Sequence, residues 1–76
     1  MNTKQRKRID KIIEQLESIQ FAIQELAEEE AEKFQNISDN LQQSEKGQTL
    51  EEKASALEEI AGNIEEAISS LEEAKE

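Results

Sequence analysis

Residues 50–76 read LEEKASA, LEEIAGN, IEEAISS and LEEAKE, a seven-residue repeat in three full copies and a truncated fourth. Leucine or isoleucine opens every copy, and a pair of glutamates follows it. An apolar residue at every seventh position, with another three residues on, is typical of an α-helix that packs one apolar stripe against a second helix. The stripe predicted for residues 50–76 comprises Leu50, Leu57, Ile60, Ile64, Ala67, Leu71 and Ala74.

A second helical pattern occupies the first half of the chain, where apolar residues recur at alternating spacings of three and four. After Leu26 the pattern slips by one residue, to Ala27 and later to Phe34. A slip of this kind locally unwinds a left-handed supercoil, so the sequence predicts a nearly straight pair of helices there. The stripe predicted for this first helix comprises Ile9, Ile12, Leu16, Ile19, Ile23, Leu26 and Phe34.

The polar segment NISDNLQQSEKGQ, residues 36–48, separates the two patterns. Asn, Ser, Asp and Gly compete with the helical backbone or tolerate positive φ, so we expect a turn in this segment. One short helical turn is allowed around residues 39–43. The first helix should run from about residue 4 to about residue 35, and the second from about residue 49 to about residue 75.

Capping residues indicate where each helix begins. Asn2 or Thr3 can cap the first helix, and Gln5 lies three residues after Asn2, as in a capping box. Thr49, followed three residues later by a glutamate, gives the corresponding signal for the second helix. Ser44 is an alternative cap that would start the second helix earlier.

Two long amphipathic helices joined by such a turn fold back antiparallel when their apolar stripes face each other. Matching Phe34 with Leu50 sets a register in which paired residue numbers sum to about 84, and apolar layers then meet along the whole length. We therefore predict an all-α, antiparallel two-helix hairpin, forming one domain over residues 1–76. Because a chain of this size builds only a small core, we expect the hairpin to assemble into a four-helix or larger bundle.

The residue composition argues against catalysis. The chain contains no histidine, cysteine or tyrosine, so an enzyme would depend on carboxylates, lysine, serine or threonine, which need a concave, partly dry site. A hairpin offers no such cavity, and the paired glutamates of the repeat face water. We predict no catalytic residue, no cofactor and no metal site. Apolar runs are also far shorter than the roughly 20 residues of a membrane span, which favours a cytoplasmic protein without membrane contact.

The basic residues cluster at the start of a chain whose net charge is −10. Because the chain as a whole repels phosphate, nucleic-acid binding is the least favoured reading. We expect the cluster to match the acidic end of the second helix, within the hairpin or between subunits, and docking to an acidic protein is the other alternative. The cluster comprises Lys4, Arg6, Lys7, Arg8 and Lys11, and its expected acidic neighbours are Glu65, Glu66, Glu72, Glu73 and Glu76.

Several residues are left over by the two stripes. Phe21 lies away from the first stripe, and small residues recur every seven positions in the second helix, as if another helix approached closely. The plainer readings are single exposed apolar residues, a weak surface and residues that close the turn. We assign as candidate contacts with another subunit or a partner Phe21, Ile37, Leu41, Ser55, Gly62 and Ser69.

The segment from Asn36 to Gly47, followed by the LEE-type heptads, resembles small uncharacterised proteins encoded by bacteriophages and prophages of Gram-positive bacteria. The resemblance covers the turn and the second helix, and more loosely the basic, isoleucine-rich start. Members of this group tend to have proline where Ser38 stands. The resemblance implies a phage or prophage origin, hence the cytoplasm of a bacterial host, and a helical hairpin, but no known activity.

Two functional hypotheses follow from these observations. The first is a non-enzymatic module for helical self-association or protein interaction, with a second copy or a host protein as partner. The second is a small acidic inhibitor that mimics nucleic acid and blocks a host defence or nucleic-acid-processing protein. A self-association module should be oligomeric on its own, whereas a mimic should bind a basic host protein at low salt.

Overall fold

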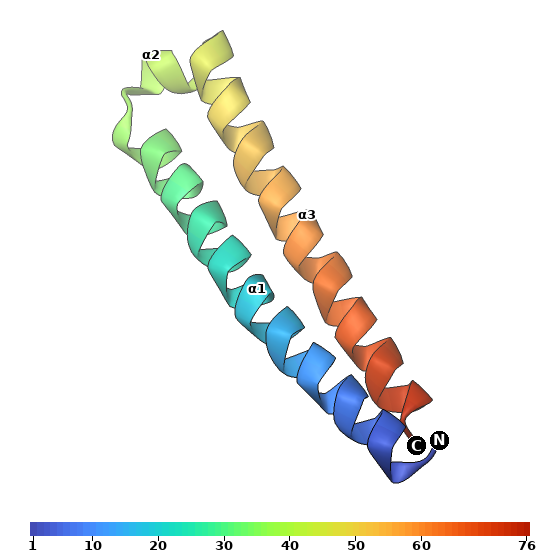
Figure 1. Cartoon of the computed structure of the whole chain (residues 1–76). Helices are drawn as coiled ribbons and strands as arrows, with labels where there is room; N and C mark the ends of the chain where they lie inside the picture. Colours follow the sequence, from blue (N-terminus) through green and yellow to red (C-terminus); the bar gives the residue numbers. More distant parts are fainter.

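Two long antiparallel helices make up most of the chain, and the computed structural model describes residues 1–76. Helix α1 spans Thr3–Asn36, a short helix α2 spans Asp39–Gln42, and helix α3 spans Glu45–Ala74. Helices α1 and α3 lie side by side, so the two termini meet at one end of a rod and α2 lies at the other (Figure 1). The rod is 58 Å long and 15 by 11 Å across, measured between Cα atoms. The predicted all-α fold is therefore confirmed.

The start of α1 follows from its first five residues. Asn2 is the N-cap, and its side-chain oxygen accepts a hydrogen bond from the backbone N–H of Gln5 at 2.8 Å. The Gln5 side-chain oxygen accepts in return from the backbone N–H of Asn2 at 3.2 Å. This reciprocal pair satisfies backbone donors that the first turn leaves free, and it confirms the predicted capping box.

Helix α1 ends at Asn36 without a proline. Ile37 and Ser38 are extended, and Ser38 has a φ of −64°, the value that a proline ring would fix. The side-chain amide of Gln42 donates to the backbone carbonyls of Phe34 and Ile37, at 3.1 and 3.4 Å. Helix α2 thus supplies partners for carbonyl groups that the end of α1 leaves unpaired.

Helix α3 begins at Glu45, about one turn earlier than the heptads alone predict. Ser44 is the N-cap, and its hydroxyl accepts from the backbone N–H of Gly47 at 3.4 Å. Thr49 lies inside the helix, where its hydroxyl donates to the carbonyl of Glu45 at 2.9 Å. The prediction of a Thr49 cap is therefore wrong, and the alternative start at Ser44 is correct. Glu45 in the first turn also suits the positive end of the helix dipole.

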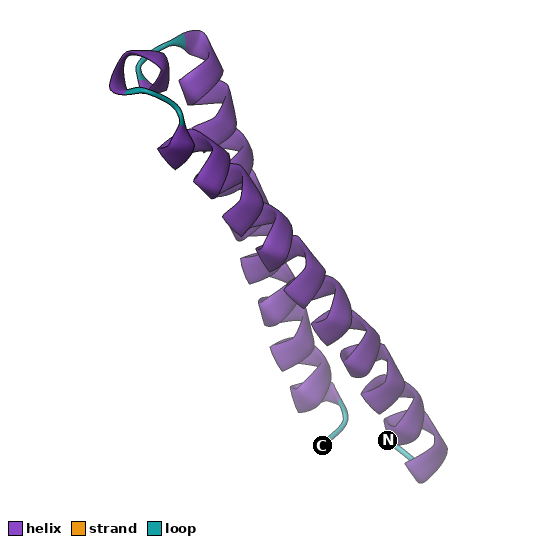
Figure 2. Ribbon diagram, turned by 90° about the vertical axis from the view of Figure 1, so that its left-hand side faces the viewer, coloured by secondary structure: helices purple, strands orange, loops and turns teal.

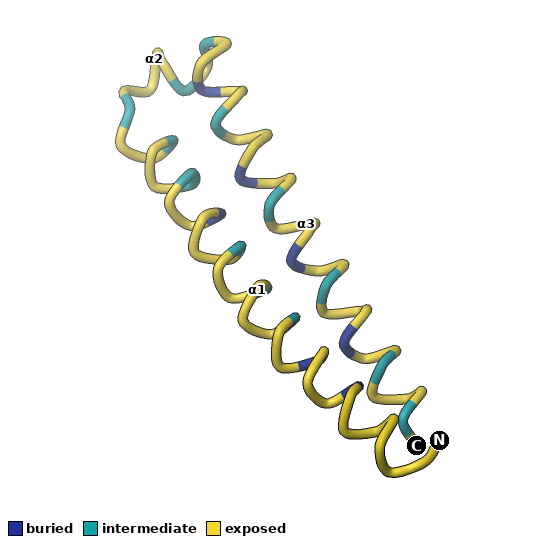
Figure 3. The backbone as a smooth tube through the Cα atoms, viewed as in Figure 1, coloured by how far each residue is buried: buried dark blue, intermediate teal, exposed yellow.

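The buried and half-buried residues of α1 and α3 form a row along the facing sides of the two helices, which we call the seam (Figure 3). Its spacing alternates between three and four residues along the whole of both helices. The predicted slip after Leu26 is therefore wrong, and the helices keep one heptad phase while crossing at a shallow angle (Figure 2). The seam comprises Ile9, Ile13, Leu16, Gln20, Ile23, Ala27, Glu30 and Phe34 of α1, with Gly47, Leu50, Ala54, Leu57, Ala61, Ile64, Ile68 and Leu71 of α3.

Six residues assigned to the stripes lie outside the seam, and three of them are isoleucines. Ile12, Ile19 and Ile60 are 44%, 49% and 44% exposed. Each of these isoleucines is followed by the residue that lies in the seam. In two of the three cases that seam residue is smaller or more polar than the isoleucine. The phase is set by Phe34, which lies 21 residues after Ile13 and therefore on the same face of a heptad helix. Leu26 is likewise half exposed, and Ala67 and Ala74 are exposed.

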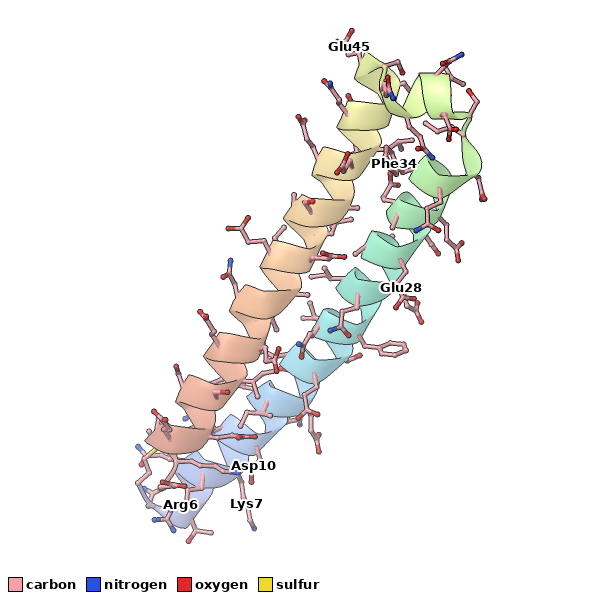
Figure 4. All side chains as sticks on the ribbon, turned by 180° about the vertical axis from the view of Figure 1, so that it is seen from behind. Arg6, Lys7, Asp10, Glu28, Phe34 and Glu45 are labelled. Carbon is pink, nitrogen blue, oxygen red and sulfur yellow. The ribbon has the colours of Figure 1, made fainter.

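The register of the hairpin agrees with the predicted sum of 84. Near the termini Ile9, Ile13 and Ile68 form a buried cluster, against which Leu16, Ile64 and Leu71 pack. Leu16 and Ile68 are a pair that the register predicts. At the very end Lys75 reaches Asp10, with Nζ 2.7 Å from Oδ1, which is one residue from the same register. Phe34 lies between the helices at the turn end (Figure 4).

Candidate interaction surfaces

The hairpin has two broad flanks that differ in chemistry. An antiparallel pair is related by a twofold rotation about an axis that runs between the helices, perpendicular to the plane of the pair. That rotation exchanges α1 and α3 without turning the pair over. Residues at the same heptad position of α1 and α3 therefore lie on the same flank. Residues just before Ile13, Gln20 and Ala61 lie on one flank, and residues just after Leu16 and the α3 leucines lie on the other.

One flank, which we call the apolar flank, carries a second row of hydrophobic residues parallel to the seam. Its large members are 44% to 49% exposed, so about half of each side chain is free to be covered. Between residues 12 and 26 of α1, none of the residues that lie on this flank is charged. The row comprises Ile12, Ile19, Leu26, Ile60, Ala67 and Ala74.

The opposite flank, which we call the acidic flank, carries eight carboxylates and one exposed aromatic residue. Phe21 is 62% exposed on this flank, and in the register it lies level with Gly62 of α3. Shallow surface depressions run beside Ser55, Gly62 and Ser69, where small residues leave the α3 surface low between glutamates. The carboxylates are those of Asp10, Glu14, Glu17, Glu28, Glu51, Glu58, Glu65 and Glu72.

The candidate contact residues fall into two separate groups. Phe21, Ser55, Gly62 and Ser69 share the acidic flank, as their common heptad position requires. Ile37 and Leu41 lie apart from them at the turn, where Ile37 is half-buried and Leu41 is 45% exposed. The half-burial of Ile37 fits the plainer reading that it closes the turn.

The basic cluster lies at the terminal end, where Arg6, Lys7 and Asp10 gather (Figure 4). Arg6 donates through Nε to the backbone carbonyl of Lys75 at 2.9 Å. The cross-helix ion pair has the opposite sense to the one expected, because its base is Lys75 of α3 and its acid is Asp10 of α1. The hydrogen bond that Lys75 Nζ donates to Asp10 Oδ1 raises the pKa of Lys75 above the ordinary lysine value of 10.5.

The expected ion pairs between the basic cluster and the C-terminal glutamates do not form. The two salt bridges of the hairpin are Lys33 with Glu30, and Lys75 with Asp10. The remaining basic side chains of the cluster reach no carboxylate and stay exposed, which leaves the intersubunit reading of their role open. They are those of Lys4, Lys7, Arg8 and Lys11.

The apolar flank was not predicted from the sequence, because all six residues of its row were assigned to the stripes that close the hairpin. The signal was present as two adjacent heptad rows on the first helix, one through Ile12 and Ile19 and the other through Ile13 and Ala27. A helix with two such rows has a wider apolar face than a single partner helix covers.

Neither flank is built like a metal site, since no three acidic side chains converge on a common point. Neither long helix contains a stretch that is apolar enough to cross a membrane. No protein-family model, curated protein or solved structure matches this chain.

Proposed function

We propose that this chain is a non-enzymatic helix-association module that pairs its hairpin with the helices of a second copy. The observation that carries the proposal is the amount of surface left exposed. The hairpin exposes 5859 Å², whereas a compact monomer of 8.7 kDa exposes roughly 4,700 Å². Its radius of gyration is 17.3 Å, against about 11 Å for a compact chain of this length.

The small core supports the same conclusion. Only 7 of 76 residues are buried, and none of the large side chains is completely enclosed. Three of the buried residues are alanines, namely Ala27, Ala54 and Ala61, which contribute little apolar area each. A single core in a chain of this size supplies about 3 to 5 kcal/mol at best, so covering a second face would add a substantial share of the total stability.

Sedimentation equilibrium of the wild-type chain tests this proposal. We expect the average mass to rise from 8.7 kDa towards twice that value over a concentration range of about 1 to 200 µM. The melting temperature should rise with concentration as well, because a partner that binds only the folded state stabilises it by mass action. A chain that is fully helical and stays at 8.7 kDa throughout would contradict the proposal.

The acidic flank favours a second candidate function, in which the chain binds a basic host protein by mimicking nucleic acid. Its carboxylates lie in rows along a rod, and Phe21 adds an exposed aromatic anchor of the kind found at binding hot spots. A phage or prophage origin belongs to this proposal as its biological setting. Affinity capture from a bacterial lysate tests it, because a mimic should retain a basic protein at low salt and release it as salt is raised.

A further inference from the structure

We infer that the apolar flank is the surface on which a second copy docks, and that the two hairpins lie antiparallel in a four-helix bundle. This inference rests on the proposed function of self-association. It adds which face is used and how the copies are oriented. The residues that carry it are Ile12, Ile19, Leu26 and Ile60, each between 44% and 49% exposed.

The contrast between the flanks selects the face. Stacking two acidic flanks would bring eight carboxylates of each copy together, with Lys7 as the only basic residue among them, and like charges in contact oppose association. The apolar flank has an uncharged centre on both helices, and its charges lie towards the ends. Those charges are of both signs and belong to Arg8, Glu29, Lys33, Lys46 and Lys53.

The available area suits a stable dimer. A flank 58 Å long and 15 Å wide presents roughly 870 Å², close to the 800 Å² per partner of a standard protein interface. The surface that the hairpin exposes beyond that of a compact monomer, roughly 1,100 Å², is of the same size. One further hairpin therefore accounts for the excess, without a larger partner.

Charge complementarity indicates the antiparallel order. When α1 of one copy crosses α1 of the other at Ile19, Ile12 lies level with the partner's Leu26 and Arg8 lies level with the partner's Glu29. Arg8, the member of the basic cluster on this flank, then lies beside the acidic stretch that begins at the partner's Glu28. A parallel order would instead bring Lys33 as close to the partner's Lys53 as it brings Glu29, so an unfavourable pair would offset the favourable one.

Matched lysine substitutions on α1 test the choice of face. Ile19→Lys and Phe21→Lys change the net charge of −10 equally and towards zero, so weakened association cannot come from added overall repulsion. Both side chains are exposed in the hairpin, at 49% and 62%, but they lie on opposite flanks. We expect Ile19→Lys to raise the dimer dissociation constant by about tenfold or more, and Phe21→Lys to leave it within about twofold. Circular dichroism checks that each variant keeps its helices.

Leu26→Lys provides a second probe of the same flank if Ile19→Lys lowers helicity. If Ile19→Lys and Leu26→Lys both dimerise as tightly as the wild-type chain, the choice of face is wrong, although self-association stands. The choice of face is also wrong if Phe21→Lys is the variant that weakens the dimer. A wild-type chain that stays monomeric when folded would overturn self-association itself.

A single cysteine tests the order, because the chain has no native cysteine. In the antiparallel arrangement Ile19 of one copy faces Ile19 of the other. Ile19→Cys should therefore cross-link readily into a disulfide dimer under mild oxidation. Phe21→Cys is the matched control and should cross-link slowly. Equal and slow cross-linking of the two variants would overturn the antiparallel order.

Discussion

The two glycines of the chain lie in helix α3 in opposite environments, which makes them a matched pair for testing how the turn packs. Gly47 is buried in the first turn of α3, where an added Cβ would lie 2.5 Å from the carbonyl oxygen of Leu41 and closer still to that of Gln42. Gly62 lies in the middle of the exposed side of α3, and an added Cβ would meet nothing within 4 Å. The same change to alanine should therefore have opposite effects.

Gly62→Ala should stabilise the hairpin by about 1 kcal/mol, the difference in helix propensity between the two residues. Gly47→Ala has the same gain in propensity, but the obstructing atoms are backbone and cannot rotate away. Helix α2 would have to shift, which disturbs the hydrogen bond from the Ser44 N–H to the Leu41 carbonyl. Overpacking of this kind costs about 1 to 3 kcal/mol, and such short contacts with backbone atoms belong at the upper end of that range. After the gain of about 1 kcal/mol in propensity, Gly47→Ala should be destabilising by about 1 to 2 kcal/mol.

Thermal unfolding followed by circular dichroism, at one low concentration, distinguishes the two effects. In a domain of this size 1 kcal/mol corresponds to about 4 to 8 °C, so the two melting temperatures should lie on opposite sides of the wild type. A melting temperature for Gly47→Ala as high as that for Gly62→Ala would refute the packing of α2 against α3. A lower mass for Gly62→Leu in a concentrated sample would instead show that the small residues of α3 form a contact between subunits.

Three further predictions concern the seam and the terminal ion pair. Ile13→Ala should destabilise the hairpin by about 2 kcal/mol or more and Ile12→Ala by less than half as much, measured by urea unfolding of dilute samples, because Ile13 is 5% exposed and Ile12 44% exposed. Equal effects would contradict the seam described here. Gln20→Leu should raise the melting temperature, since it replaces a half-buried polar group level with Ile64, and an unchanged or lower value would show that the amide has a partner in the assembly. Because Asp10 raises the pKa of Lys75, the pair stabilises the folded state below pH 10.5 and this contribution is lost as the pH rises through the folded pKa. The difference in melting temperature between wild type and Lys75→Gln should therefore disappear by about pH 12, and a difference that persists there would count against the ion pair.

The heptads of residues 50–76 were sufficient to predict the fold, because a seven-residue period specifies both a helix and a partner helix. The capping box of Asn2 and Gln5 and the register set by Phe34 with Leu50 could be predicted for a similar reason, since each depends on a short, local rule. The choice between the start at Ser44 and the start at Thr49 could not be made from such rules. It depends on the tertiary approach of α2 to Gly47.

The phase of the seam could not be predicted from apolarity alone. Ile12 and Ile13 are chemically identical, and Ile19 is more apolar than the Gln20 that takes the inner position. The correct phase follows only when the whole helix is considered, because Phe34 and Ala27 fit one uninterrupted heptad series with Gln20 and exclude Ile19. Small inner residues such as Ala61 also let the helices approach closely, a preference that a scale of hydrophobicity does not record.

The same ambiguity concealed the apolar flank. With Ile12, Ile19, Leu26 and Ile60 placed between the helices, the sequence predicted no row of large apolar residues on either flank. In the structure all four side chains are 44% to 49% exposed, and they form one row on the apolar flank. The residues that close the hairpin and those we infer to join two copies are thus neighbours in the heptad.

Small-angle X-ray scattering over a concentration series of the wild-type chain tests most directly that one hairpin covers the apolar flank of another. The mass from forward scattering should rise from 8.7 kDa towards twice that value, while the longest dimension stays close to that of one hairpin, whose Cα extent is 58 Å. A mass of 8.7 kDa at every concentration would contradict the account, and so would a dimer of about twice the length, in which the hairpins meet only end to end.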